Sequence, residues 1–276
     1  MRKLFIFLFL FLSIFSQEKH YVTPSRALTT PVYDVLKSLD FFLSGGGTVG
    51  IEGEAYALGN VNMDFGDLFE LEVSVSSIVN AVENKSSLLP TSTFKMKLLS
   101  SNELKAGLTF LMKKTMWNIE YDIDTKFSYY TRFSELMIIG GFKNNYINLN
   151  FGGKITDLRA QIKMIDSIVE GEKMKKSYGG FFNILIQVNP KTYGIFEISD
   201  KIRINYIGKT HLDLDRNVSQ VISVSLGGRY FFNEFISIDA GTLWRSDYKG
   251  IGDAVINAGV NIGIPFEGLG KEIFKE

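Results

Sequence analysis

The chain contains no cysteine, only two histidines and only five prolines among its 276 residues. Without cysteine it can form neither a disulfide framework nor a thiolate metal site. Two isolated histidines cannot supply a soft metal site either, so we predict no metal and no cofactor. The scarcity of proline, together with 23 Phe, 12 Tyr and 26 Gly, favours many regular strands.

Only the first residues of the chain form a long apolar run. Arg2 and Lys3 precede an uninterrupted apolar stretch from Leu4 to Leu12, which is the layout of a signal peptide. About a dozen apolar residues make ~18 Å of helix, too short for the ~30 Å hydrocarbon core of a membrane. We therefore predict that residues 1–16 are a signal peptide, cleaved after Ser16, and that the protein is exported.

No later segment approaches the eighteen consecutive apolar residues that a spanning helix needs. A membrane crossing by this chain must therefore use strands, because hydrocarbon accepts only helices and closed barrels.

The chain also has no surplus of charge of either sign. Without residues 1–16, the 30 Lys and Arg become 28, against 30 Asp and Glu. This balance argues against nucleic acid as a partner, which would favour clustered basic residues.

From about residue 45 onward, apolar and polar residues alternate strictly. Residues 69–76 read FELEVSVS, residues 117–124 read WNIEYDID, and residues 256–264 read INAGVNIGI. Successive side chains of a strand point to opposite faces, so each such strand has one apolar and one polar face. A soluble sandwich would alternate in the same way. Long strands with aromatic residues near their ends favour a membrane-spanning barrel instead.

The alternation predicts thirteen strands: 46–57, 60–76, 92–100, 103–113, 116–124, 125–132, 135–143, 145–156, 179–188, 192–206, 217–232, 235–246 and 253–264. Single-chain bacterial barrels close with an even number, so one of these strands must be wrong. Merging residues 116–132 into one strand would give twelve. The predicted fold class is an all-β, antiparallel, up-and-down transmembrane β-barrel of about 12 strands (10–14) over residues 45–264.

The remaining segments flank or interrupt this barrel. Residues 17–44 are predicted to form an N-terminal arm with a short helix at 31–39, where Thr30 is the N-cap and Pro31 the first helical position. This arm is either a plug inside the barrel or a periplasmic element. Residues 76–84 and 161–176 have helical spacing and are predicted to be long loops, each with a short helix. Residues 265–276 form a C-terminal tail.

Charged residues on the polar faces are the candidates for the lumen. They are Glu70, Glu72, Lys95, Lys97, Glu120, Asp122, Asp124, Lys201, Arg203 and Arg229. A barrel of about twelve strands has a narrow lumen, which cross-strand ion pairs of these residues could largely fill. Because the two signs nearly cancel, the sequence gives no preference between cations and anions.

Catalytic patterns are weak. His211 and Asp213 would share one face of a strand, as in a Ser-His-acid triad of a lipid-acting enzyme, but no nucleophile motif accompanies them. Glu120, Asp122 and Asp124 share a face and repel one another unless a cation such as calcium intervenes. The glycine pairs and triplets match no phosphate-binding loop. We therefore predict that the protein is not an enzyme.

Residues 257–264 read NAGVNIGI, with Asn257, Gly259, Ile262 and Ile264 in a polar-x-Gly-x-x-apolar-x-apolar pattern. This pattern resembles the signal that bacterial outer-membrane β-barrels carry in their closing strand. The resemblance implies that the barrel-assembly machinery reads these residues and that outer-membrane lipid surrounds the barrel. The predicted helix before the first strand is faintly similar to the plug of fatty-acid transporters.

Three functions fit a multi-pass barrel in the cell outer membrane. The first is a narrow, porin-like passive channel or transporter for small solutes or hydrophobic compounds, because the inward faces are polar; the solute itself is unknown. The second is a non-transporting structural or adhesive surface barrel, whose lumen is filled by ion pairs or by residues 31–39. The third is a lipid-acting outer-membrane enzyme centred on His211. Architecture alone does not choose among them.

Overall fold

A computed structural model of the protein describes residues 21–36, 40–49, 54–65, 67–80, 85–101, 103–122, 126–164, 167–204, 213–250 and 253–265. The elements are β1 (Asp40–Val49), β2 (Glu54–Phe65), β3 (Phe69–Asn80), β4 (Lys85–Ser101), β5 (Ala106–Thr115), β6 (Asn118–Asp122), β7 (Phe127–Lys143), β8 (Ile147–Met164), β9 (Ser167–Asn189), β10 (Thr192–Ile204), α2 (Leu214–Asn217), β11 (Val218–Phe231), β12 (Ile236–Arg245) and β13 (Val255–Pro265). Within these ranges, none of the helices has the length and hydropathy to cross a membrane.

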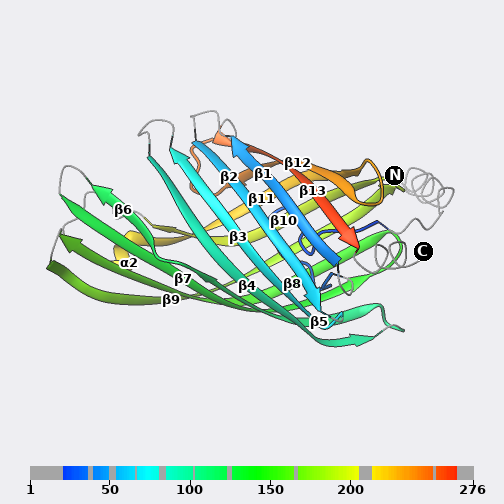
Figure 1. Cartoon of the computed structure of the whole chain (residues 1–276), viewed down its shortest axis with the longest axis horizontal. Helices are drawn as coiled ribbons and strands as arrows, with labels where there is room; N and C mark the ends of the chain where they lie inside the picture. Colours follow the sequence, from blue (N-terminus) through cyan, green and yellow to red (C-terminus); the bar gives the residue numbers. More distant parts are fainter. Residues whose placement is uncertain are drawn as a thin grey trace, which may run out of the picture.

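The strands form one antiparallel sheet that closes on itself (Figure 1). Sequential neighbours pair along the chain, and β1 pairs with β13 from Asp40–Pro265 to Val49–Ile256. Both β5 and β6 pair with β7, so these two strands share one position in the wall. The result is a closed 12-strand antiparallel barrel, and the predicted fold class is confirmed.

The strand list from the sequence is wrong in detail. The predicted strands 125–132 and 135–143 are one strand, β7, whereas 103–113 and 116–124 are the two halves of a single wall position. Lys126, a turn residue directly before β7, has a φ of 58°, so β7 begins at Phe127. The predicted strand 46–57 runs from β1 into β2, and 60–76 runs from β2 into β3. β1 begins at Asp40, before the predicted barrel boundary at residue 45.

Segments with helical spacing are extended where the structure describes them. Residues 76–80 belong to β3, and most of 161–176 belongs to β8 and β9. Apolar residues three or four apart also fit a strand when β-branched residues dominate, as in this stretch. The helix predicted for 31–39 is not found at residues 31–36, and residues 37–39 lie outside the described part of the chain.

The two faces of the wall differ in polarity as the alternation predicts. Side chains that point outward are apolar and exposed, as in Ile138, Phe151 and Ile155 at 44–55% exposure. The outward apolar positions of β8 run from residue 147 to 155, ~26 Å at 3.3 Å per residue, which suits a tilted strand crossing a membrane. Buried side chains that face inward are largely polar, including many Asn, Ser and Thr.

The two ends of the barrel are built differently. Short connections join β2 to β3, β7 to β8 and β9 to β10 at the end where β1 begins and β13 ends. We call this the terminal end and the opposite one the far end. At the far end, β7, β8 and β9 extend beyond the other strands (Figure 1). Their inner face carries an apolar cluster around Tyr129 and Leu158, which α2 covers through Leu214.

Candidate functional site: a lumen occupied by residues 21–36

Residues 21–36, here called the N-terminal segment, lie inside the barrel near its terminal end. The Val22 amide donates to the Glu234 carbonyl in the turn between β11 and β12 (2.9 Å). The chain then folds back on itself as a small hairpin, in which the Ala27 amide donates to the Thr30 carbonyl (2.8 Å). A bridge between Arg26 and Pro31 closes this hairpin. Its tip therefore points away from the terminal end, into the lumen.

Glu197 of β10 binds the tip of the hairpin. Its carboxylate accepts hydrogen bonds from the amides of Leu28 (2.6 Å), Thr29 (2.8 Å) and Thr30 (3.1 Å). The hydroxyls of Thr29 (3.0 Å) and Thr30 (2.9 Å) donate to the same carboxylate. Glu197 is only 1% exposed, and a buried carboxylate needs such donors to offset its lost hydration. The charge and the tip thus stabilise each other.

Two wall asparagines bind the returning half of the hairpin. Asn150 of β8 accepts from the Tyr33 amide (2.8 Å) and donates to Asn183 of β9 (2.7 Å). Asn183 in turn donates to the Thr30 hydroxyl (2.8 Å) and the Pro31 carbonyl (2.9 Å). Both asparagines are fully buried, so these bonds satisfy amide groups that water does not reach.

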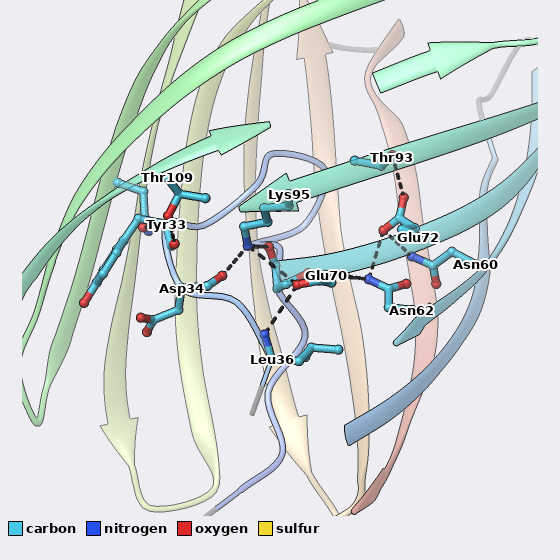
Figure 2. Close-up of polar contacts among 12 residues, drawn as sticks. Tyr33, Asp34, Leu36, Asn60, Asn62, Glu70, Glu72, Thr93, Lys95 and Thr109 are labelled. Atoms are coloured by element: carbon cyan, nitrogen blue, oxygen red, sulfur yellow. Dashed lines mark hydrogen bonds and ion pairs between the residues drawn. The ribbon is translucent and has the colours of Figure 1, made fainter. Parts of the chain in front are cut away.

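Glu70 and Lys95 contact the last residues of the N-terminal segment, Asp34 and Leu36 (Figure 2), and also Ser25. Glu70 accepts from the Ser25 hydroxyl and from the Leu36 amide, and Lys95 donates to the carbonyl of Asp34. The two side chains also face each other across β3 and β4, at 3.9 Å and 3% exposure each. The predicted lumen residues Glu70 and Lys95 are therefore placed against the segment.

Arg229 of β11 and Asp239 of β12 form a buried pair beneath the hairpin. Two guanidinium nitrogens of Arg229 lie 2.7 and 2.9 Å from the Asp239 carboxylate, and the arginine is 2% exposed. The same guanidinium donates to the carbonyl of Ala27 at 2.6 Å. A planar guanidinium can bind a carboxylate and a backbone carbonyl together, which a lysine could not do in this geometry.

A pair of glycines makes room for the Tyr33 ring. Gly107 of β5 and Gly141 of β7 lie directly opposite each other. A Cβ at Gly107 would lie 2.7 Å from the ring, and one at Gly141 would overlap it at 2.0 Å. Any larger residue at either position would therefore displace Tyr33, which is 6% exposed. The sequence suggests only bends at such glycines, whereas the structure gives these two a packing role.

Substitution of Gly141 is expected to loosen the N-terminal segment. A leucine there cannot coexist with the Tyr33 ring, so trypsin should cleave after Arg26 about tenfold faster than in the unmodified barrel. Gly153→Leu is the matched control, because nothing lies within 4 Å of a Cβ at that outward position. Equal cleavage rates in the two variants, both folded by heat-modifiable gel migration, would contradict the described seat of Tyr33.

A cluster of charges lies beyond the hairpin tip. Lys154 of β8 is 3.7 Å from Glu135 and 3.4 Å from Asp200. Lys113 and Lys201 lie within electrostatic range of Glu135 from β5 and β10. Among the described residues, neither of these two ammonium groups forms an ion pair. Beside the tip, three lysines therefore lie near three carboxylates, those of Glu135, Asp200 and Glu197.

The other predicted lumen residues are more dispersed. Glu72 is half-buried and accepts from Asn62 (3.0 Å), and Lys97 is half-buried near the terminal end of β4. Arg203 pairs with Asp247 (2.7 Å) at the far end. Glu120 and Asp122 lie on β6 without described side chains, and Asp124 is outside the described residues, as is His211. In β13, Asn257 is buried and Gly259 lies on the same face, while Ile262 is 39% exposed on the other and Ile264, two residues on, shares that outer face.

Sequence reasoning missed four of the residues that contact the N-terminal segment: Glu197, Asn183, Asn150 and Thr109, whose hydroxyl donates to the Tyr33 carbonyl. A usable signal was present for Glu197. It is the single charge in the stretch YGIFEIS, where an isolated carboxylate needs a specific partner. The asparagines carried no such signal, because uncharged polar residues are common on any inward face.

Comparisons with known proteins agree with this architecture. No family model matches the chain, and no curated protein matches it. Solved structures that match include LpxR from Salmonella typhimurium (10% identity, TM-score 0.47, covering 81% of this chain and 99% of that chain) and the translocator domain of the autotransporter NalP from Neisseria meningitidis (10%, 0.44, 82% and 88%). Omp33 of Acinetobacter baumannii also matches (10%, 0.42, 83% and 100%).

The chain has the fold of bacterial outer-membrane β-barrels. Its closed wall, apolar outer surface and polar interior place this barrel in an outer membrane, because only such a surface is stable against lipid. At sequence identities of 8–10%, these structures resemble the chain in fold alone.

One prediction is corrected by these matches. The sequence predicts that the protein is not an enzyme, and this exclusion is wrong, since the outer-membrane enzyme LpxR is among the matching barrels. The prediction relied on missing local motifs. In a barrel, catalytic side chains can come from separate strands and loops, which leave no motif in the sequence.

Proposed function

We propose that the protein is a narrow passive channel of the outer membrane for small polar solutes, closed at rest by its N-terminal segment. In this proposal residues 1–16 direct export, the barrel-assembly machinery inserts the barrel, and the terminal end faces the periplasm. Short turns at that end support this orientation, since outer-membrane barrels have short periplasmic turns and longer outer loops.

The observation that carries the proposal is the chemistry of the contacts between the N-terminal segment and the wall. Glu197, Asn183, Lys95 and Arg229 all bind backbone groups or hydroxyls of the segment. Water can replace such hydrogen bonds at a net cost of about 1 kcal/mol each. The segment also buries apolar side chains: Ala27, Leu28 and Val32 pack in one small cluster with wall residues, and Tyr33 packs in another. Because release would break the hydrogen bonds and expose both clusters, the closed state is expected to dominate.

The charges beyond the hairpin tip support a polar solute. Lys113, Lys154 and Lys201 converge there from three strands, beside the carboxylates of Glu135, Asp200 and Glu197. Charged groups of both signs keep this part of the lumen favourable to polar solutes, without a preference between cations and anions.

Planar-bilayer recording tests the proposal. Openings of the intact protein should show little preference between cations and anions, and Lys201→Glu should shift the reversal potential in a salt gradient toward the cation value. Lys191→Glu, in the turn between β9 and β10, is the matched control and should leave the reversal potential unchanged. An unchanged reversal potential in Lys201→Glu would refute a pathway past these charges.

A non-transporting surface barrel is the second candidate. It is favoured by the far-end extension of β7, β8 and β9, whose apolar cluster under α2 gives a structured surface outside the membrane band. If this is the function, the barrel will remain electrically silent even after the N-terminal segment is removed.

A further inference from the structure

On the outward face of β5, β7, β8 and β9, charged side chains begin at one level. Met112, Leu136, Ile155 and Tyr178 are apolar residues of this face, each 44–67% exposed. Two residues farther toward the far end of each strand, and therefore on the same face, come Lys114, Ser134, Asp157 and Lys176. Beyond this level the face is mixed, since Met174 is 52% exposed among the charges. A change from an apolar band to a mixed, charged surface is typical of the level of lipid headgroups.

Two arginines lie directly opposite each other just beyond this boundary. Arg132 of β7 and Arg159 of β8 are cross-strand partners in the β7–β8 ladder. Like charges directly opposite one another destabilise a sheet unless an anion lies between them. Glu172 pairs with Arg159 at 2.8 Å, but Arg132 has no such partner, and its Nε is a buried donor without a hydrogen bond in the described part of the chain.

The surrounding residues add to this positive charge. Lys114, Lys163 and Lys176 complete, with the two arginines, what we call the outer basic patch; Asp157 and Glu172 are the acids within it. Among the described side chains of this patch, five cations therefore face two carboxylates. Aromatic rings also hold two of the cations in place, with Arg132 4.7 Å from the centre of Trp117 and Lys163 4.6 Å from that of Tyr130.

From this geometry we infer that the outer basic patch binds the phosphate groups of anionic lipids in the leaflet at the far end of the barrel. A guanidinium fork suits the tetrahedral oxygens of a phosphate, and the paired forks of Arg132 and Arg159 can bind one phosphate together. Acyl chains of the same lipid would lie along the apolar band below, against Leu136 and Ile155. The occupant is a lipid because the charges adjoin the membrane surface rather than an aqueous pocket.

Trp117 makes this binding measurable, because it contacts Arg132 and the chain has only one other tryptophan. The full-length barrel with Trp244→Phe is placed in phosphatidylcholine vesicles that contain a minor fraction of brominated lipid. Brominated phosphatidylglycerol should quench Trp117 more strongly than brominated phosphatidylcholine at the same fraction. In Arg132→Gln/Arg159→Gln this preference should fall about tenfold, as expected for loss of charge-assisted hydrogen bonds.

Matched variants distinguish lipid binding at the outer basic patch from attraction of anionic lipid by the overall charge of the protein. Lys105→Gln/Lys191→Gln removes the same charge at the terminal end and should leave the preference intact. Equal quenching by the two brominated lipids, or an equal loss in both double variants, would overturn the inference. So would abolition of the preference by millimolar inorganic phosphate but not by chloride at matched ionic strength, since the site would then bind free phosphate. Heat-modifiable migration shows that each variant is folded.

Discussion

Removal of residues 21–36 should convert the barrel into an open pore. The N-terminal segment is held by hydrogen bonds from at least five wall strands, which together keep an open state rare. If the closed state outweighs the open one by about 99 to 1, deletion raises mean single-channel current about a hundredfold. The first strand begins at Asp40, so its pairing with β13 survives the deletion. The measurement is planar-bilayer recording at fixed voltage.

Single substitutions should change the open probability by intermediate amounts, and one of them serves as a control. Glu197→Gln keeps the volume of the side chain but replaces one acceptor oxygen by a donor amide, so the hairpin tip loses part of its binding. An open probability between those of the intact and deleted proteins is expected. Glu172→Gln, on the outer face, should behave as the intact protein does. A deletion variant that inserts normally but stays silent would favour the non-transporting alternative.

Asp239→Ala should destabilise the barrel more than any other single change considered so far. Arg229 is 2% exposed and would lose its only carboxylate partner in the described structure. Breaking one side of a buried ion pair costs about 3–5 kcal/mol, because the remaining charge stays without compensation. Equilibrium unfolding by guanidinium in lipid vesicles measures this loss directly.

Two further variants test whether the stability lost in Asp239→Ala comes from the buried ion pair. Asp247→Ala breaks more exposed pairs with Arg203 and Arg245, each worth about 0–1 kcal/mol, and should shift the unfolding midpoint much less than Asp239→Ala. Arg229→Met/Asp239→Leu removes both charges and should regain most of the stability. If Asp239→Ala is no more destabilising than Asp247→Ala, the buried pair does not contribute as its geometry indicates.

The wall of this barrel could be predicted from the sequence, because alternation is a local property. Stretches such as 69–76 and 256–264 show one apolar and one polar face without any knowledge of their neighbours. Strand count was harder. β5 and β6 share a wall position only because both pair with β7, and such pairing depends on registers that the sequence of a single strand does not specify.

The interior could not be predicted to the same degree, because its partners are far apart in the chain. Thr30 and Pro31 have the character of a helix start, yet their polar groups bind Glu197 and Asn183, more than 150 residues away. These tertiary contacts give the polar groups the hydrogen-bond partners that capping would give them in a helix. The local preference for a helix start is therefore overridden. Inward charges such as Glu70 could be proposed from alternation, but not the segment that they contact.

A reversible cross-link between the hairpin and the wall tests the central claim most directly. The chain has no cysteine, so Thr30→Cys/Asn183→Cys introduces a single pair, at side chains now 2.8 Å apart. Oxidation should form a disulfide that holds the N-terminal segment in the lumen and abolishes all openings in a bilayer. Reduction of the same channels should then restore openings more frequent than those of the intact protein, since the Thr30–Asn183 hydrogen bond is lost. Conductance that is the same in the oxidised and reduced states, with the disulfide verified by mass spectrometry, would contradict a gate formed by residues 21–36.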